Sequence, residues 1–205
     1  MTADFKKLPD HFYTRENVIQ ISKDLLGKFL MTRIEGEIVT GGMIVETEAY
    51  AGATDRASHA YGNRRTNRTE TMFSQGGISY VYLCYGIHNL FNIVTNQSEI
   101  PHAVLIRAIE PTLGIDLMIQ RRKKKKLDFT LTSGPGSLSE ALGITRNQNS
   151  VSLLDDEIWV EDHGISFPEN KIIASPRVGV GYAKEDALLP WRFRIKENPW
   201  TSKSK

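Results

Sequence analysis

Met43-Ile-Val-Glu-Thr-Glu-Ala-Tyr50 is the most informative stretch of this chain, and it ends a predicted strand over residues 37–50. Successive side chains of a strand point to opposite faces of its sheet. One face of this strand carries Ile44, Glu46, Glu48 and Tyr50. The other carries Met43, Val45, Thr47 and Ala49. The strand therefore presents two carboxylates and a phenol on the same side.

Glu46 and Glu48 have two possible interpretations. Two carboxylates this close raise one another's pKa, more strongly when they are partly buried. A carboxylate with a raised pKa is a competent general base. The alternative is an exposed strand face with two solvated glutamates, which the spacing alone favours.

The rest of the chain predicts many short strands and few helices. We predict helices over residues 14–26 (with Thr14 as N-cap), 113–122, and a short segment ending near Gly143. Strands are predicted over 28–34, 37–50, 78–85, 87–95, 102–108, 158–161, 177–182 and 191–195. Glu35-Gly36 is the predicted turn between the first two strands, and residues 51–77 are a predicted long loop.

Strands dominate this pattern and helices do not alternate with them, which predicts an α+β fold. We expect a single domain over residues 1–205, with its core over about 8–200. Its expected architecture is an antiparallel or mixed, curved β-sheet flanked by helices, with a protruding β-hairpin over 78–95.

Composition excludes several classes of protein. The chain has 205 residues, 40% hydrophobic and 24% charged, as in a soluble globular domain. Cys84 is the only cysteine, which excludes an intramolecular disulfide and a cysteine-cluster zinc site. No apolar run approaches the roughly 20 residues that span a bilayer, and the N-terminus has no apolar signal segment. We expect a cytoplasmic, DNA-associated protein without a membrane partner, and a monomer by default.

The net charge of +2 does not by itself indicate a nucleic-acid partner, but the basic residues are clustered. Arg64, Arg65 and Arg68 form one cluster, and residues 121–126 form an unbroken basic run. The acidic residues are scattered, so local positive fields can persist near neutrality.

Three residues in and after the strand suggest a weaker, metal-based alternative. Glu48, Asp55 and His59 are possible oxygen and nitrogen ligands of a divalent metal. No fixed ligand spacing such as HExxH is present, however. Asp55 is equally well interpreted as the cap of a turn, and His59 as a loop histidine.

The predicted hairpin is rich in tyrosine. Tyr80 and Tyr82 share a face, where aromatic residues commonly pack in a core. Tyr85 precedes Gly86 at the expected tip, where an aromatic is harder to explain as core. Such a side chain can wedge between base pairs. Asn92, a polar residue in the apolar returning strand, indicates a buried hydrogen bond that is either structural or reads a ligand.

Arg107 interrupts another apolar strand, in Val-Leu-Ile-Arg-Ala-Ile-Glu-Pro111. A half-buried arginine requires a carboxylate or phosphate partner. A structural ion pair and a functional one are equally compatible with this position.

Taken in order, these segments resemble the alkyladenine (3-methyladenine) DNA glycosylases, the methylpurine-DNA glycosylase type. The resemblance runs from about Leu8 to Trp200. Its motifs are Asp24-Leu-Leu-Gly27, Ile44-Val-Glu-Thr-Glu-Ala-Tyr50, Asp55 to His59, Met72-Phe73, Tyr80-Val-Tyr82, Tyr85-Gly86, Phe91-Asn-Ile-Val-Thr95, Leu105-Ile-Arg-Ala-Ile-Glu-Pro111, Ser133-Gly-Pro-Gly136, Arg177-Val-Gly-Val-Gly181 and Pro190-Trp-Arg-Phe193. The family usually has Arg-Asn ahead of its Met-Phe pair, whereas Arg68 is followed here by Thr69.

The resemblance implies a monofunctional DNA repair glycosylase that needs no cofactor or metal. Such an enzyme flips an alkylated or deaminated purine out of duplex DNA and hydrolyses its N-glycosidic bond, leaving an abasic site. The implied catalytic residues are Glu48, which activates water, and Arg107, which helps to hold it. The implied base pocket consists of Tyr50, His59, Tyr82 and Asn92. Tyr85 is the implied DNA wedge, and Arg64, Arg65 and Arg68 are candidate contacts to the DNA backbone.

Two other functions compete with this one: a metal-dependent nuclease that uses Glu48, Asp55 and His59, and a non-catalytic nucleic-acid binder. The Glu-x-Glu-x-Tyr face combined with an aromatic hairpin tip favours the glycosylase.

Overall fold

The computed structural model describes residues 5–34 and 36–203. Within these residues nine strands form one antiparallel sheet, and its main path runs β1-β7-β2-β3-β6-β5-β4. The strands are β1 Lys6–Lys7, β2 Phe29–Thr32, β3 Thr40–Tyr50, β4 Ser79–Cys84, β5 His88–Thr95, β6 His102–Leu113, β7 Ile158–Asp162, β8 Ile172–Ser175 and β9 Arg192–Ile195. β9 pairs with β3 and with β8, off the main path. The expected α+β fold is confirmed.

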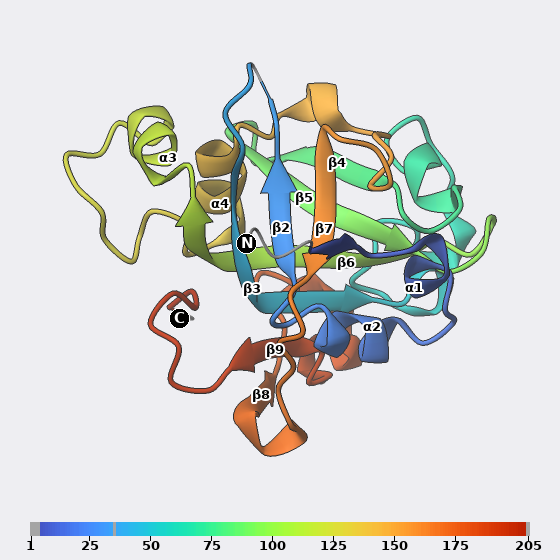
Figure 1. Cartoon of the computed structure of the whole chain (residues 1–205). Coiled ribbons are helices and arrows are strands. Elements are labelled where there is room, and N and C mark those ends of the chain that lie inside the picture. The colour runs from blue at the N-terminus through green and yellow to red at the C-terminus, as the bar shows by residue number, and fades with distance from the viewer. Residues whose placement is uncertain (1–4, 35, 204–205) are drawn as a thin grey trace.

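Short helices flank this sheet (Figure 1). The α-helices are α1 Asp10–Tyr13, α2 Val18–Asp24, α3 Ile115–Arg121 and α4 Pro135–Leu142. The 3-10 helices are η1 Gly52–Thr54, η2 Tyr61–Asn63, η3 Glu70–Phe73, η4 Arg146–Gln148, η5 Glu169–Lys171 and η6 Gly181–Leu188. None of the helices in these two described ranges is long and apolar enough to cross a membrane.

β3 and β6 form the longest pairing of the sheet, and both change direction along their length (Figure 1). Their register shifts between Ile44 and Glu46 and again between Glu46 and Thr47. Such bulges bend a strand and increase its twist. They accompany the curvature of the sheet at the position where Glu46 lies opposite Ala108, beside Arg107.

The main apolar core lies between the sheet and the helices that cover it. Ile21 and Leu25, from the α2 region, are fully buried in this core together with Ile44 and Ile106. A second, smaller core contains Tyr80 with residues of the 51–77 segment. These two cores hold β3, β4 and the irregular segment together at one end of the sheet.

Several local predictions were wrong. The first long helix begins at Val18 rather than after Thr14, because Asn17 provides the cap and accepts a hydrogen bond from the Gln20 amide. The predicted strand over 177–182 is absent from the described residues, where bends lead into η6. β1 and β8 were not predicted. The predicted turn at Glu35-Gly36 lies partly outside the described residues.

β4 and β5 pair antiparallel, with Cys84 opposite His88. Residues 85–87 connect them, and Tyr85 and Gly86 have φ values of 50° and 75°. The Ile87 amide donates to the Cys84 carbonyl oxygen. Positive φ at both central residues is the requirement of a type I′ turn, in which a tyrosine is unusual. The protrusion of this hairpin from the domain remains a prediction.

Candidate active site

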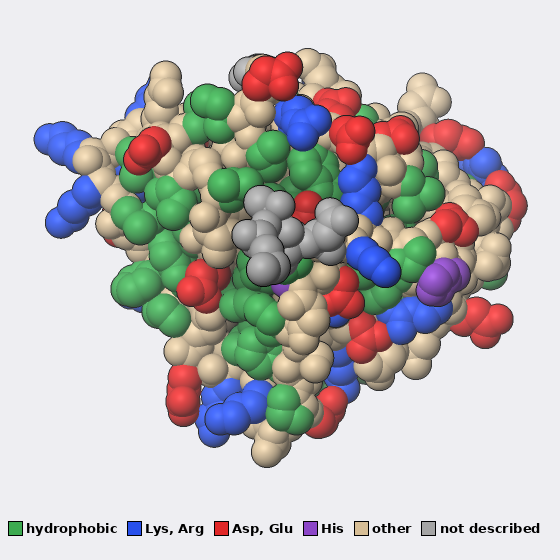
Figure 2. Space-filling view, viewed as in Figure 1, with side chains coloured by type: hydrophobic (Ala, Val, Ile, Leu, Met, Phe, Trp, Pro, Cys, Tyr) green, Lys and Arg blue, Asp and Glu red, His purple; other side chains and the backbone are tan. Residues whose placement is uncertain are grey.

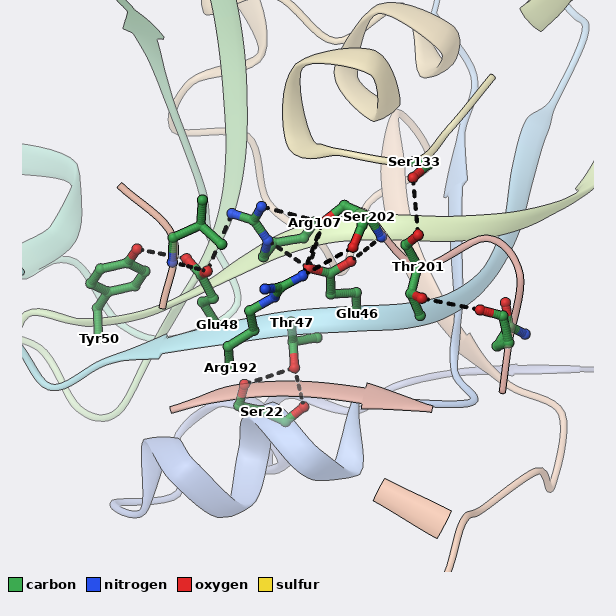
Figure 3. Close-up of polar contacts among 12 residues, drawn as sticks. Ser22, Glu46, Thr47, Glu48, Tyr50, Arg107, Ser133, Arg192, Thr201 and Ser202 are labelled. Atoms are coloured by element: carbon green, nitrogen blue, oxygen red, sulfur yellow. Dashed lines mark hydrogen bonds and ion pairs between the residues drawn. The ribbon is translucent and has the colours of Figure 1, made fainter. Parts of the chain in front are cut away.

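The two glutamates of β3 lie in a buried cluster of charges. Both side chains are completely buried and point to the same side of the strand, whereas Thr47 points to the other side and bonds Ser22 of α2 (Figure 3). The predicted alternation is thus confirmed, and the exposed-face alternative is wrong. Arg107 binds both glutamates, with its Nε 2.7 Å from Glu46 Oε1 and its Nη1 3.2 Å from Glu48 Oε1.

Glu46 is the structural anchor of the cluster. Its Oε1 accepts hydrogen bonds from Arg107 Nε, from Arg192 Nε at 2.7 Å and from the Ser202 hydroxyl at 2.8 Å. Burial alone would raise the pKa of Glu46, but the positive charges of Arg107 and Arg192 and the Ser202 amide outweigh it and lower that pKa. The expectation that neighbouring carboxylates raise each other's pKa is therefore wrong for Glu46.

Glu48 is bound through both of its carboxylate oxygens. Oε1 accepts from the Val178 amide at 2.8 Å and faces Arg107, and Oε2 accepts from the Tyr50 hydroxyl at 2.8 Å. Burial, and then the negative charge of Glu48, raise the pKa of Tyr50 well above its ordinary value, so Tyr50 is a neutral donor. Glu48 is held as a buried, hydrogen-bonded carboxylate (Figure 3).

A cavity of roughly 600 Å³ lies against this cluster. Its lining includes three partners of Glu48, namely Tyr50, Arg107 and Val178, which places Glu48 directly behind the wall. The remaining predicted pocket residues, His59, Tyr82 and Asn92, also line it, and so does Tyr85. The volume of this cavity and its mixed aromatic and polar lining are typical of a small-molecule site.

His59 is a neutral group in the cavity wall. Burial, together with the positive charges of Arg68 and Arg64, lowers its pKa to about 4. Its Nδ1 lies 2.8 Å from Tyr80 Oη, and its Nε2 lies 3.3 Å from Arg68 Nη2. The ring also makes an edge contact with Tyr82, with 4.6 Å between centroids. The loop-histidine interpretation underestimates how firmly His59 is held.

Asn92 is buried on β5, as its place in an apolar strand predicted. Its Nδ2 donates to the carbonyl oxygens of Tyr80 and Leu90 at 3.0 and 3.4 Å. These bonds fix the amide at the cavity wall, so a structural hydrogen bond and a place in the cavity lining coexist.

Asp55 does not belong with Glu48 and His59 in a ligand set. Both of its oxygens bind the buried Arg177 guanidinium, and they also accept from the Ala51 and Ala57 amides. The interpretation of Asp55 as a turn cap is confirmed. Within residues 5–34 and 36–203, no group of three or more His, Cys, Asp or Glu side chains is arranged to hold a metal.

The salt bridge between Asp55 and Arg177 also supports the wall of the active site. Arg177 stacks on the rings of Tyr50 and Trp191, at 4.7 and 5.0 Å from their centroids. The backbone amide of the next residue, Val178, donates to Glu48 rather than to a neighbouring strand. Residues 177–182 do not form the predicted strand because Arg177 binds Asp55, because the Val178 amide binds Glu48, and because Gly179 is left-handed at φ 75°.

The three arginines of the first basic cluster have different surroundings. Arg65 pairs with Glu70 and Glu99, whereas Arg64 makes no ion pair with any described residue. Arg68 reaches into the cavity and lies over the Tyr82 ring, 4.9 Å from its centroid. Thr69, where the family usually has asparagine, uses its hydroxyl to bond the Arg64 carbonyl and the Thr66 amide. It thereby holds the turn that carries these arginines.

Several side chains of the second basic run bind other groups of the protein. Arg121 donates to the carbonyl oxygens of Ile34 and Ala141. Arg122 pairs with Glu140, and Lys124 with Asp128. Basic side chains project from the edge where α3 and the following segment lie (Figure 2), and charges of both signs are mixed on the rest of that face.

Four supporting residues were given no role from the sequence: Arg192, Ser202, Arg177 and Val178. Arg192 carries the same signal as Arg107, a charge in an apolar strand. Ser202 lies beyond the expected core boundary near residue 200, and nothing in its sequence context indicates its contact with Glu46. Val178 acts through its backbone, which no side-chain pattern reveals.

The site thus combines a buried, hydrogen-bonded carboxylate with an aromatic cavity. The profile of the Methylpurine-DNA glycosylase (MPG) family matches residues 11–199. A protein of Chlamydia felis is 48% identical over 189 residues, covering 92% of this chain and 95% of its own length. One of Clostridium novyi is 42% identical over 207 residues, covering 97% and 99%. Both carry the name "Putative 3-methyladenine DNA glycosylase".

The chain therefore belongs to the methylpurine-DNA glycosylase family. It is a monofunctional DNA repair glycosylase, a hydrolase of N-glycosidic bonds.

Proposed function

We propose that this enzyme flips an alkylated or deaminated purine nucleotide out of duplex DNA into the 600 Å³ cavity and releases the base, with Glu48 activating water. A base inside the helix must leave the stack before water can reach its sugar carbon. The products are the free base and an abasic site, without strand cleavage.

Glu48 has one acceptor position left for the water. A carboxylate offers about four lone-pair positions. The Val178 amide and Arg107 use Oε1, and Tyr50 uses one position of Oε2. The second position of Oε2 takes the proton as the water oxygen bonds to C1′ and the glycosidic bond breaks. The electron pair of that bond leaves with the base.

Arg107 and Glu46 hold this carboxylate in place. Two glutamates and two arginines balance in charge within the buried cluster, which limits the cost of removing them from water. In this proposal Arg107 positions Glu48 and the water, and Glu46 anchors Arg107.

The cavity suits a flat aromatic base. The rings of Tyr50 and Tyr82 line the cavity and offer aromatic surface on which a flat base can stack. An N-alkylated purine departs readily because its positive charge is neutralised as the bond breaks. His59, with its pKa of about 4, does not add a second charge at neutral pH.

Tyr85 is the proposed wedge. Its side chain is 87% exposed at the tip of the β4–β5 turn, and apolar wedges that replace a flipped base are typically presented in this way. Arg64 and the other exposed basic side chains supply phosphate contacts, which make binding strongly dependent on salt.

The observation that carries this proposal is the anchoring of Glu48 by Tyr50, Arg107 and Val178 at the wall of an aromatic cavity. The test is the release of base from methylated and deaminated duplex DNA in EDTA. We expect release by the wild type, and binding without release by Glu48→Gln.

Glu46→Gln is the matched control, because it changes a second buried glutamate two residues away. We expect it to lower stability while leaving base release measurable at low temperature. Release by Glu48→Gln at the wild-type rate would remove Glu48 from the reaction. Loss of all wild-type activity in EDTA would favour a metal-dependent reaction, and strand nicking without alkali would contradict the monofunctional chemistry.

A further inference from the structure

Arg68 occupies the surface of the cavity that the flipped base is proposed to use. Its guanidinium lies over the ring of Tyr82, 4.9 Å from the centroid, and donates to His59 Nε2 at 3.3 Å. It is also a lining residue of the cavity. Its predicted role was a contact to the DNA backbone; the residue is exposed, but these contacts hold its guanidinium against the cavity wall. A base that stacks on this face of Tyr82 must therefore contact the guanidinium or displace it.

The contact with Arg68 also determines the tautomer of His59. Arginine has donors only, so His59 Nε2 must accept through its lone pair. The ring proton of the neutral histidine then lies on Nδ1, which donates to Tyr80 Oη at 2.8 Å. The low pKa of His59 agrees with this neutral form. His59 therefore presents no donor at Nε2, and the guanidinium of Arg68 supplies the donors beside it.

Purines differ in the hydrogen-bond acceptors that they present to an arginine. A 6-oxopurine with free N7 presents two adjacent acceptors, O6 and N7, which is the edge that arginine binds through two hydrogen bonds in guanine. Adenine-type bases present an amino donor at position 6. Alkylation at N7 removes one acceptor, and alkylation at N7 or N3 makes the base cationic.

Both possible fates of Arg68 disfavour a cationic base. If the guanidinium stays, it repels the positive charge in a partly enclosed site. If it is displaced, its contacts with Tyr82 and His59 are lost, and the cation gains only the ring face that the guanidinium leaves. A neutral 6-oxopurine avoids both costs, because it can bind the guanidinium directly.

We propose that Arg68 is a specificity-determining residue that favours neutral 6-oxopurines, such as hypoxanthine, over cationic N-alkylpurines. This proposal rests on the proposed function, because it concerns the base that this same cavity accepts. Arg68 acts here by its position on Tyr82 and His59, whereas Arg64, in the same basic cluster, does not line the cavity.

The test compares base release from two duplexes of identical sequence, one with hypoxanthine and one with 7-methylguanine at the same position. Single-turnover rates and kcat/KM are measured for wild type, Arg68→Gln, Arg68→Lys and Arg64→Gln. We expect Arg68→Gln to lower the ratio of hypoxanthine to 7-methylguanine release by about tenfold or more, as expected for loss of a two-bond arginine contact. Arg68→Lys keeps the charge without the planar fork, so its ratio should be intermediate.

Arg64→Gln is the control for a change of charge near the DNA. It should alter both rates by a similar factor and leave their ratio unchanged. A second readout follows His59 by NMR: its pKa should rise in Arg68→Gln, because one of the positive charges that lower it is gone.

An unchanged ratio in Arg68→Gln, with both bases released by the wild type, would overturn the proposal while leaving the glycosylase function intact. A wild type that released 7-methylguanine but not hypoxanthine would overturn it as well. A wild type that released neither base, nor any other damaged purine, would instead refute the proposed function on which it depends.

Discussion

Replacement of Tyr85 by asparagine separates the contribution of the hairpin turn to stability from its contribution to activity. Tyr85 has φ 50° and is 87% exposed, so its ring gains little from packing and its backbone is in the left-handed region. That region costs a residue with a Cβ roughly 1–2 kcal/mol. Asparagine tolerates it better, and Asn-Gly is a preferred type I′ pair.

Tyr85→Asn should therefore raise the free energy of unfolding by about 0.5–1 kcal/mol. In a domain of this size that corresponds to an increase in Tm of about 1–4 °C. Thermal or urea unfolding measures it. Tyr85→Phe, which keeps both the ring and the strained backbone, should unfold like the wild type.

Activity should change in the opposite direction. Loss of an aromatic that fills a gap in stacked bases removes about 1–3 kcal/mol, or about 5- to 150-fold in base release from duplex DNA. A single-stranded substrate has no gap to fill, so the same variant should lose much less there. Tyr85→Phe should keep the duplex rate.

Two results would refute this reasoning independently. A wild-type duplex rate in Tyr85→Asn would remove the wedge. A lower Tm in that variant would show that the tyrosine stabilises the turn despite its backbone conformation.

Four other substitutions test the charges around the site. Glu46→Gln should lower the free energy of unfolding by about 3–5 kcal/mol, because it leaves the buried Arg107 without its anchor. The folded pKa of Glu46 lies below its ordinary value of 4.5. The wild type should therefore lose this stabilisation as the pH falls below 4.5, and the variant should not. His59 has a folded pKa of about 4 against 6.5 when unfolded, so the unfolded state binds the extra proton and stability should fall from pH 6.5 towards 4. Urea titrations of His59→Gln should lack that part of the slope. Arg64→Gln should reduce the dependence of log K on log salt by about one phosphate contact. Arg65→Gln should reduce it less, because Glu70 and Glu99 already balance that charge; equal slopes for the two variants would contradict this assignment.

Much of the site could be predicted from local patterns. The period of a strand placed Glu46 and Glu48 on one face and Thr47 on the other, which the structure confirms. A charge inside an apolar strand indicated that Arg107 has a carboxylate or phosphate partner, and the structure shows two carboxylates. These predictions succeeded because strand geometry depends on neighbours in the chain, and because a buried arginine is costly without a partner.

Local patterns failed where two positions offered equivalent chemistry. Thr14 and Asn17 are both good N-caps, and only the packing of α2 on the sheet selects Asn17. Residues 177–182 have the composition of a strand, but Arg177 is drawn to Asp55, and the Val178 amide to Glu48. Both contacts cross more than a hundred residues of sequence.

By itself, then, the sequence determined the class of fold, the shared face of the two glutamates and the exposed tyrosine at a turn, since each is encoded over a few consecutive residues. The tertiary structure alone decided which glutamate is the anchor and which lies directly behind the cavity wall, because Arg192 and Ser202 reach Glu46 from the far end of the chain. It also decided the direction of the pKa shift of Glu46 and the inward position of Arg68. These properties depend on the distances between charges that only folding brings together.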